Sequence, residues 1–147
     1  MPQGFAGGSY DSAVIGDRFR LGHPPTILAR TASVAPIGFT RLKSEGASLG
    51  RTKDVPAENA YLFHVQFQPA AVDMWIDGKL RPATTTTPGI TFLYDLRSNP
   101  VAEIYSSFDN VRFYISQASL DEIAFDQGIR RTEGLLSSRL GSHDRVM

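Results

Sequence analysis

Short extended segments follow one another along most of this chain, and they limit the folds that it can adopt. In the clearest segment, Tyr61, Phe63 and Val65 alternate with His64 and Gln66. A strand has this two-residue period because successive side chains point to opposite faces. Several such segments at spacings of about 8–12 residues, without helices between them, predict an antiparallel sandwich or barrel.

The other expected strands are bounded by residues that favour turns. Asp77-Gly78 predicts a tight hairpin turn because its central positions need positive φ. Phe108-Asp109-Asn110 is also expected to turn, and the threonine run 84–87 to form a loop. The expected strands cover residues 27–33, 34–43, 60–68, 72–76, 79–83, 90–96, 101–106 and 111–116.

One amphipathic helix is predicted after the strands, at residues 117–127. Ser116 or Ser119 could cap it, and Ser119 with Glu122 fits a capping box. Gly128 supplies a residue that readily adopts the left-handed conformation at a helix end. The apolar stripe, Leu120, Ile123, Ala124 and Phe125, is wide enough either to pack on the sheets or to meet a second copy of the chain.

The chain divides by pattern into three parts. Residues 1–15, which begin with several glycines, are expected to form a flexible arm. Residues 16–128 hold the strands and the helix. Residues 129–147 are expected to form a connector and, after Ser142, the start of a truncated helix.

Composition excludes several classes of protein. The 147 residues carry 15 lysines and arginines against 15 aspartates and glutamates, so no net field attracts nucleic acid or anionic lipid. The absence of cysteine excludes disulfides and thiolate sites. No apolar run approaches the ~20 residues that span a bilayer, and the N-terminus lacks the pattern of a signal peptide. A cytoplasmic location is the resulting expectation.

Several segments in this order resemble the N-terminal domain of AraC-type transcriptional regulators. The resemblance covers roughly residues 30–147 and describes strands, turns and a capped helix better than a chemistry. It implies a mainly β, cupin-like antiparallel barrel or jelly roll with one or two C-terminal helices. The matching segments are Val34–Arg41, Ala60–Gln68, Trp75–Lys79, Tyr94–Arg97, Phe108–Ile115 and Ala118–Ile123.

The resemblance also implies a function. Domains of this kind bind a small-molecule effector, often form homodimers, and reach DNA only through a C-terminal pair of helix-turn-helix units. No such units are visible here, so we expect an isolated ligand-sensing domain that is not an enzyme, carries no cofactor and binds no membrane.

A small cupin enzyme, an isomerase or a metal-dependent dioxygenase, is the alternative interpretation. Cupin metal sites use a His-x-His pair, a glutamate and a further histidine, because several imidazoles and a carboxylate must face one ion. Here His23, His64 and His143 stand apart, and position 66 is Gln66. The pattern therefore does not predict a metal site.

Polar and aromatic side chains on the expected strands are the candidates for a ligand site. A few converging polar groups in an apolar pocket are typical of small-molecule sites. The alternative is that the aromatic residues belong to the core and their hydroxyl groups reach the rim. The candidates are Arg41, His64, Gln66, Trp75, Tyr94 and Tyr114.

Overall fold

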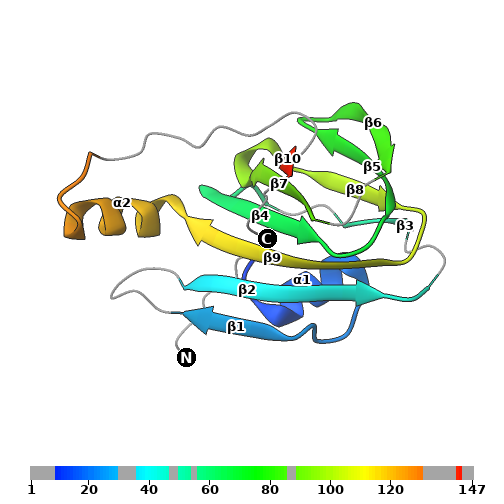
Figure 1. The fold of residues 1–147 in the computed structure, drawn as a ribbon, viewed down its shortest axis with the longest axis horizontal. Helices are drawn as coiled ribbons and strands as arrows, with labels where there is room; N and C mark the ends of the chain where they lie inside the picture. The colour runs from blue at the N-terminus through cyan, green and yellow to red at the C-terminus, as the bar shows by residue number, and fades with distance from the viewer. Residues whose placement is uncertain are drawn as a thin grey trace.

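Two antiparallel sheets make up most of the computed structural model, which describes residues 9–29, 36–46, 50–53, 56–85, 89–130 and 142–143 (Figure 1). The first sheet runs in the order β1 (Thr26–Ala29), β2 (Ile37–Ser44), β9 (Phe108–Ser116), β4 (Ala60–Gln66), β7 (Ile90–Asp95) and β10 (Ser142–His143). The second runs in the order β3 (Gly50–Arg51), β8 (Val101–Ile104), β5 (Ala71–Ile76) and β6 (Lys79–Thr85). The predicted class, a mainly β fold with antiparallel strands, is confirmed.

The hairpin between β5 and β6 forms as the sequence predicts. Asp77 and Gly78 have φ values of 52° and 73°, which are the positive angles that the tight turn requires. Pairing then proceeds from Ile76 opposite Lys79, with one irregularity between Val72 and Met74. Such an irregularity locally bends a strand.

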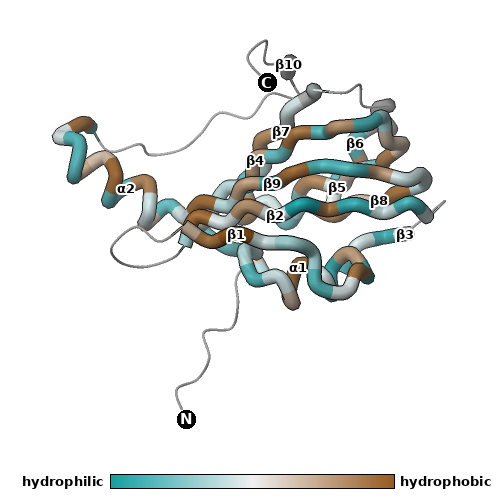
Figure 2. Tube along the Cα trace, turned by 60° about the horizontal axis from the view of Figure 1, so that its bottom comes forward, coloured by the Kyte–Doolittle hydropathy of each residue, from teal (hydrophilic) through white to brown (hydrophobic). Residues whose placement is uncertain are grey.

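Helix α2 (Gln117–Asp126) confirms the predicted helix and resolves its cap. The Ser116 hydroxyl accepts a hydrogen bond from the backbone N–H of Ser119 at 3.1 Å, so Ser116 is the N-cap. Gly128 follows the helix at φ 63°, the expected left-handed position. The helix continues directly from β9 and projects beyond the end of the sheets (Figure 2).

Helix α1 (Ser12–Phe19) was not predicted and overlaps the end of the expected arm, residues 1–15. The Asp11 carboxylate caps it, accepting from the N–H groups of Ala13 at 2.8 Å and Val14 at 3.4 Å. Arg20 ends it in the left-handed conformation. Residues 1–8 lie outside the described part of the chain.

Three local expectations differ from the structure. Residues 108–110 continue β9 rather than turning, because Phe108 pairs with Ser44 and Asn110 with Gln66. Thr84 and Thr85 extend β6 instead of joining a loop. Ser142–His143 pair with the edge of β7 instead of opening a helix, since a strand edge offers unpaired backbone groups. The expectations for residues 30–35, 86–88, 131–141 and 144–147 fall outside the described residues.

Among the described residues, the interior contains two separate apolar clusters. The first is Ile15, Leu42, Ala70, Ile104 and Phe108, and it joins α1 to both sheets. The second is Ala60, Leu62, Leu96 and Tyr114, and it lies near the start of α2. Leu96 belongs to the short 3-10 turn η1 (Leu96–Ser98). No helix in the described ranges is long and apolar enough to cross a bilayer.

Candidate ligand-binding site

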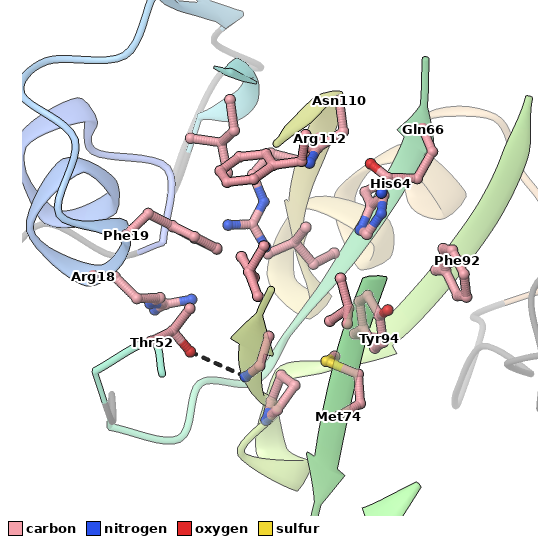
Figure 3. Close-up of a pocket in the computed structure, with 17 residues that line it drawn as sticks. Arg18, Phe19, Thr52, His64, Gln66, Met74, Phe92, Tyr94, Asn110 and Arg112 are labelled. Atoms are coloured by element: carbon pink, nitrogen blue, oxygen red, sulfur yellow. Dashed lines mark hydrogen bonds between the residues drawn. The ribbon is translucent and has the colours of Figure 1, made fainter. Parts of the chain in front are cut away.

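A cavity of about 90 Å³ lies between the two sheets and beside α1 (Figure 3). One buried water needs only ~10–15 Å³, so the space is large enough for a small molecule. Its apolar wall consists of Phe19, Leu42, Leu62, Val72, Met74, Phe92, Pro100, Ala102, Ile104 and Phe108. Its polar wall consists of Arg18, Thr52, His64, Gln66, Tyr94, Asn110 and Arg112.

Arg112 is the most unusual member of the polar wall. It lies on β9, a central strand between β2 and β4, and only 8% of its surface is exposed. Its Nε and Nη1 atoms have no hydrogen-bond partner among the described residues. Its guanidinium lies 4.9 Å from the centre of the Phe19 ring, a cation–π contact that offsets part of the cost of burial.

The Arg112 guanidinium remains charged at neutral pH despite its surroundings. Burial, together with the nearby positive charge of Arg18, lowers the pKa of Arg112 to about 9. This is still two units above pH 7, so the cation dominates. The cavity therefore contains a positive charge that carries unused hydrogen-bond donors.

Arg18 brings a second guanidinium to the cavity from α1, and it is 4% exposed. Its Nη2 donates to the Ser9 hydroxyl at 2.7 Å, and that hydroxyl donates to Glu58 Oε1 at 2.7 Å. Burial lowers the pKa of Arg18, and the charge of Glu58 partly opposes this. Arg18 thus has an indirect acidic partner, but its Nε remains without a hydrogen-bond partner in the described structure.

His64 lies directly across from Arg112 on the neighbouring strand β4. Burial, followed by the positive charge of Arg112, lowers its pKa to about 3, so the imidazole is neutral at pH 7. Its Nε2 has no hydrogen-bond partner among the described residues. The ring is 5.1 Å from Phe92 and 5.7 Å from Tyr94, measured between ring centres.

An aromatic surface from β7 closes the side opposite α1 (Figure 3). The rings of Phe92 and Tyr94 are nearly parallel, with an interplanar angle of 4° and centres 6.0 Å apart. Burial raises the pKa of the Tyr94 hydroxyl well above its usual value, although the charge of Arg112 opposes the shift. Tyr94 is therefore protonated at neutral pH and able to donate a hydrogen bond.

Side-chain amides add further polar groups beside Arg112. Gln66 and Asn110 are opposite each other on β4 and β9, and both line the cavity. Asn110 Oδ1 is buried and has no hydrogen-bond partner among the described residues. Buried polar atoms are almost always paired, so a group of unpaired ones facing the same cavity indicates a place for a ligand or ordered water.

Three of the six candidates from the sequence meet at this cavity: His64, Gln66 and Tyr94. They lie on one face of β4 and of β7, as the two-residue period requires. The structure therefore brings these three side chains together at one cavity, and their role in ligand binding stays a prediction.

The other three candidates lie elsewhere. Arg41 points to the outer face of its sheet and forms a bidentate ion pair with Asp109, at 3.0 and 2.7 Å. Trp75 lies under the guanidinium of Arg51, 4.4 Å from the ring centre. Tyr114 belongs to the second apolar cluster and donates to Glu58 Oε2 at 2.9 Å.

The two arginines and Asn110 were missed by the sequence analysis. Arg112 alternates with Val111 and Phe113, and that pattern alone assigns it to one of two faces without saying which face is inside. Because the strand was expected to lie within the sheet, an inward-pointing Arg112 could have been considered. Arg18 could not have been found, because α1 itself was not predicted.

The described residues contain no group of three His, Cys, Asp or Glu side chains that could hold a metal ion. His64 is the one histidine on the cavity wall, and the other polar groups there are guanidinium, amide and hydroxyl groups. These side chains can donate and accept hydrogen bonds to a polar molecule.

Comparisons with known proteins return similar folds and no family. No family model and no curated protein matches this sequence. The solved structures that resemble it include the cupin domain of Schizosaccharomyces pombe Cnp3, at 9% identity and TM-score 0.42, covering 74% of each chain. The Drosophila melanogaster CENP-C cupin domain matches at 12% identity and TM-score 0.37, over 71% of this chain and 92% of that one.

A third similar structure is a mutant of Bacillus subtilis oxalate decarboxylase OxdC, at 9% identity and TM-score 0.40. The match covers 65% of this chain and only 29% of the decarboxylase. All three likenesses concern the fold alone. The resemblance to AraC-type regulators remains a prediction from the sequence.

Proposed function

We propose that this chain is the cytoplasmic ligand-sensing and dimerisation domain of an AraC-type transcriptional regulator. Its cavity would bind a small effector, and this binding would change the DNA affinity of a DNA-binding region outside these 147 residues. The observation that carries the proposal is the group of buried, unpaired polar atoms on Arg112, His64 and Asn110 around one cavity. A cavity of this composition suits recognition of a polar molecule.

A hydrogen-bonded network supports communication between the cavity and the helix. Arg18 contacts Ser9, Ser9 contacts Glu58, and Glu58 accepts from the Tyr114 hydroxyl. Tyr114 lies on β9, which leads without interruption into α2. A ligand that repositions Arg18 would therefore change contacts that end near the start of α2.

Such a ligand would act by shifting populations rather than by creating a new state. It would favour the arrangement of α1 and α2 to which it binds more tightly. Coupling free energies between sites are typically about 1–3 kcal/mol, enough to change the affinity of a second site several-fold or more.

Helix α2 is the proposed dimer contact. Ala124 is buried against the rest of the domain, whereas Phe125 is 85% exposed and Ile129, just after the helix, is 61% exposed. An apolar pair of this size on a projecting element suits contact with a second copy of the chain. We propose a homodimer formed through α2.

The ligand-sensing proposal is tested by thermal-shift titration of the purified chain with a library of small metabolites. At least one compound should raise the melting temperature, and the His64→Leu variant should lose this response because it changes the cavity wall. The exposed His23→Leu variant is the matched control. A library that leaves the melting temperature unchanged would contradict the proposal. A metal ion in the purified protein together with turnover of a ligand would favour the cupin-enzyme alternative.

The dimer proposal is tested by sedimentation equilibrium. Phe125→Glu should weaken self-association at least tenfold, because a charge would be buried at the contact. Phe67→Glu, at a 50% exposed phenylalanine after β4, is the matched control. If the chain is monomeric at all concentrations, or if Phe125→Glu changes nothing, the α2 contact is wrong.

A further inference from the structure

We propose that the ligand of this cavity is a small organic carboxylate whose anionic group is held by Arg112 and Arg18. The inference rests on the proposed function, because it assumes that the cavity is a ligand site. It goes further by naming the charge and the chemical class of the ligand.

Arg18 and Arg112 both line the cavity, and the 17 residues that line it include no aspartate or glutamate. Glu58 reaches Arg18 only through the Ser9 hydroxyl. Arg112 has no acidic partner among the described residues. The wall therefore has an excess of positive charge.

A buried ion without a partner destabilises a folded protein, which is why buried charges are normally paired. The Phe19 ring compensates only in part, since a cation–π contact is weaker than the desolvation of a buried guanidinium. An anion bound beside Arg112 would supply the missing compensation.

Arg112 offers Nε and Nη1 as buried donors without a partner, and Arg18 adds its Nε. The Nε–H and Nη1–H groups of one guanidinium lie on different edges of its plane, so either edge of Arg112 can donate a charge-assisted hydrogen bond to a carboxylate oxygen. The arrangement favours a carboxylate or another oxyanion over a neutral ligand.

The rest of the cavity favours an organic anion over an inorganic one. The remaining wall is largely apolar, with Phe92 and Met74 on the side away from α1 (Figure 3). An inorganic ion would leave this surface without contacts, whereas a short carbon chain would cover it. The volume of about 90 Å³ limits the ligand to a small acid.

Neighbouring groups suit the same ligand. His64 is neutral at pH 7 and lies across from Arg112, so its ring adds hydrogen-bonding capacity without adding charge. The protonated Tyr94 hydroxyl provides a further donor. A keto or hydroxyl group next to the carboxylate would find partners here, which favours small 2-oxo or 2-hydroxy acids among the carboxylates.

The test is a titration of the 15N-labelled 147-residue chain, observed through the arginine Nε–H resonances. The probes are acetate, propionate, pyruvate and lactate, with acetamide, propionamide, pyruvamide and lactamide as neutral counterparts and inorganic phosphate as the inorganic anion. At least one carboxylate should shift the Arg112 Nε–H resonance in a saturable way, at least tenfold more tightly than its amide.

Variants connect the shift to the proposed residues. Arg112→Met should weaken carboxylate binding by about 10- to 100-fold, the usual effect of removing hydrogen bonds to a charged group. Arg112→Lys should retain part of the affinity, because it keeps the charge and loses the planar guanidinium. Arg41→Met, on the outer face of the sheet, is the matched control and should bind like the original chain.

The outcomes distinguish the two proposals. Equal binding of acids and amides, or carboxylate binding that Arg112→Met leaves intact, would overturn the carboxylate inference and leave the sensing function standing. Binding of phosphate alone would overturn it too. Binding of a neutral metabolite but of none of the acids would also overturn the carboxylate inference and leave the sensing function standing. If neither the acids nor the metabolite library binds, both proposals are wrong.

Discussion

The two faces of the six-stranded sheet differ most clearly around one pair of residues at its centre. On the inner face, the middle of β4 and β9 carries His64 and Arg112. On the outer face, one row carries Phe39, Phe113 and Phe63 on three neighbouring strands. Sheets with one solvated face usually place apolar residues inward and polar ones outward. Around His64 and Arg112 this order is reversed, although Leu42, Leu62, Phe92 and Phe108 on the same inner face are apolar.

The outer row is a packed surface and not a set of isolated rings. Phe39 and Phe113 meet edge to face with centres 4.9 Å apart, and Phe63 lies 5.9 Å from Phe113. All three are partly buried. Cross-strand aromatic pairs of this kind stabilise a sheet. The inner face, by contrast, places polar groups between the two core clusters, as we expect if these groups serve the proposed ligand binding.

The largest expected effect compares the inner core with the outer row. Phe108→Ala removes a ring that is 2% exposed and should lower the free energy of unfolding by about 3–5 kcal/mol. Phe113→Ala removes a ring that keeps some solvent contact and should lower it by only about 1–2 kcal/mol. Chemical denaturation of both variants measures the difference. Equal losses would show that the outer row is packed as deeply as the core.

The second expectation concerns acid and the buried imidazole. His64 has a pKa of about 3 in the folded chain, against about 6.5 when unfolded, so protons bind the unfolded state more readily. This contribution to stability is fully present above pH 6.5 and is lost progressively as the pH falls toward 3. At pH 5 the loss in the free energy of unfolding is about 2 kcal/mol.

His64→Leu should therefore flatten the dependence of unfolding free energy on pH between 7.5 and 5. Asp95 and Asp109 also have lowered pKa values, caused by hydrogen bonds from Arg97 and Arg41, but their effect falls below this window. His23→Leu, at an exposed histidine, is the matched control. An unchanged slope in His64→Leu would mean that solvent reaches the imidazole.

The third expectation is a gain in stability. Arg112→Met keeps a similar length while removing a buried charge with unpaired N–H groups, and it should raise the free energy of unfolding by about 1–2 kcal/mol in the absence of ligand. Arg41→Met, which removes a paired and exposed guanidinium, should give no gain. Denaturant melts of both variants measure this. Destabilisation by Arg112→Met would contradict the view that the inner face gives up stability for binding.

Local chemistry made much of the fold predictable. The alternation in residues 60–68, the Asp77-Gly78 turn and the serine-capped helix each depend on a few neighbouring residues, and each forms as expected. The turn predicted at residues 108–110 was wrong, because pairing of these residues with β2 and β4 outweighed their local preference for a turn. Helix α1 was not predicted, because a short helix with a glycine in its middle, Gly16, gives a weak periodic pattern in the sequence.

The candidate site was only half predictable, for a different reason. Periodicity groups His64 with Gln66, but it does not say which face of a strand is inside. The usual assumption that apolar residues point inward is misleading at Arg112, because this charged side chain faces the cavity. Arg41 resembled a site residue in sequence, yet its strand places it outward beside Asp109. Only the three-dimensional arrangement separates these two arginines.

The smallest expected effect comes from that outward arginine. Arg41→Gln breaks an ion pair whose arginine side chain is 52% exposed, so the melting temperature should fall by no more than about 2 °C at low salt, and by less at high salt. The pKa of Asp109 should rise toward its usual value, because the hydrogen bond from Arg41 is the main cause of its lowering. Carboxyl-carbon NMR titration measures this shift. Binding of any cavity ligand should remain unchanged, since Arg41 and the cavity lie on opposite faces of the sheet. A loss of ligand affinity in Arg41→Gln equal to that in Arg112→Met would contradict the division between a binding face and a structural face.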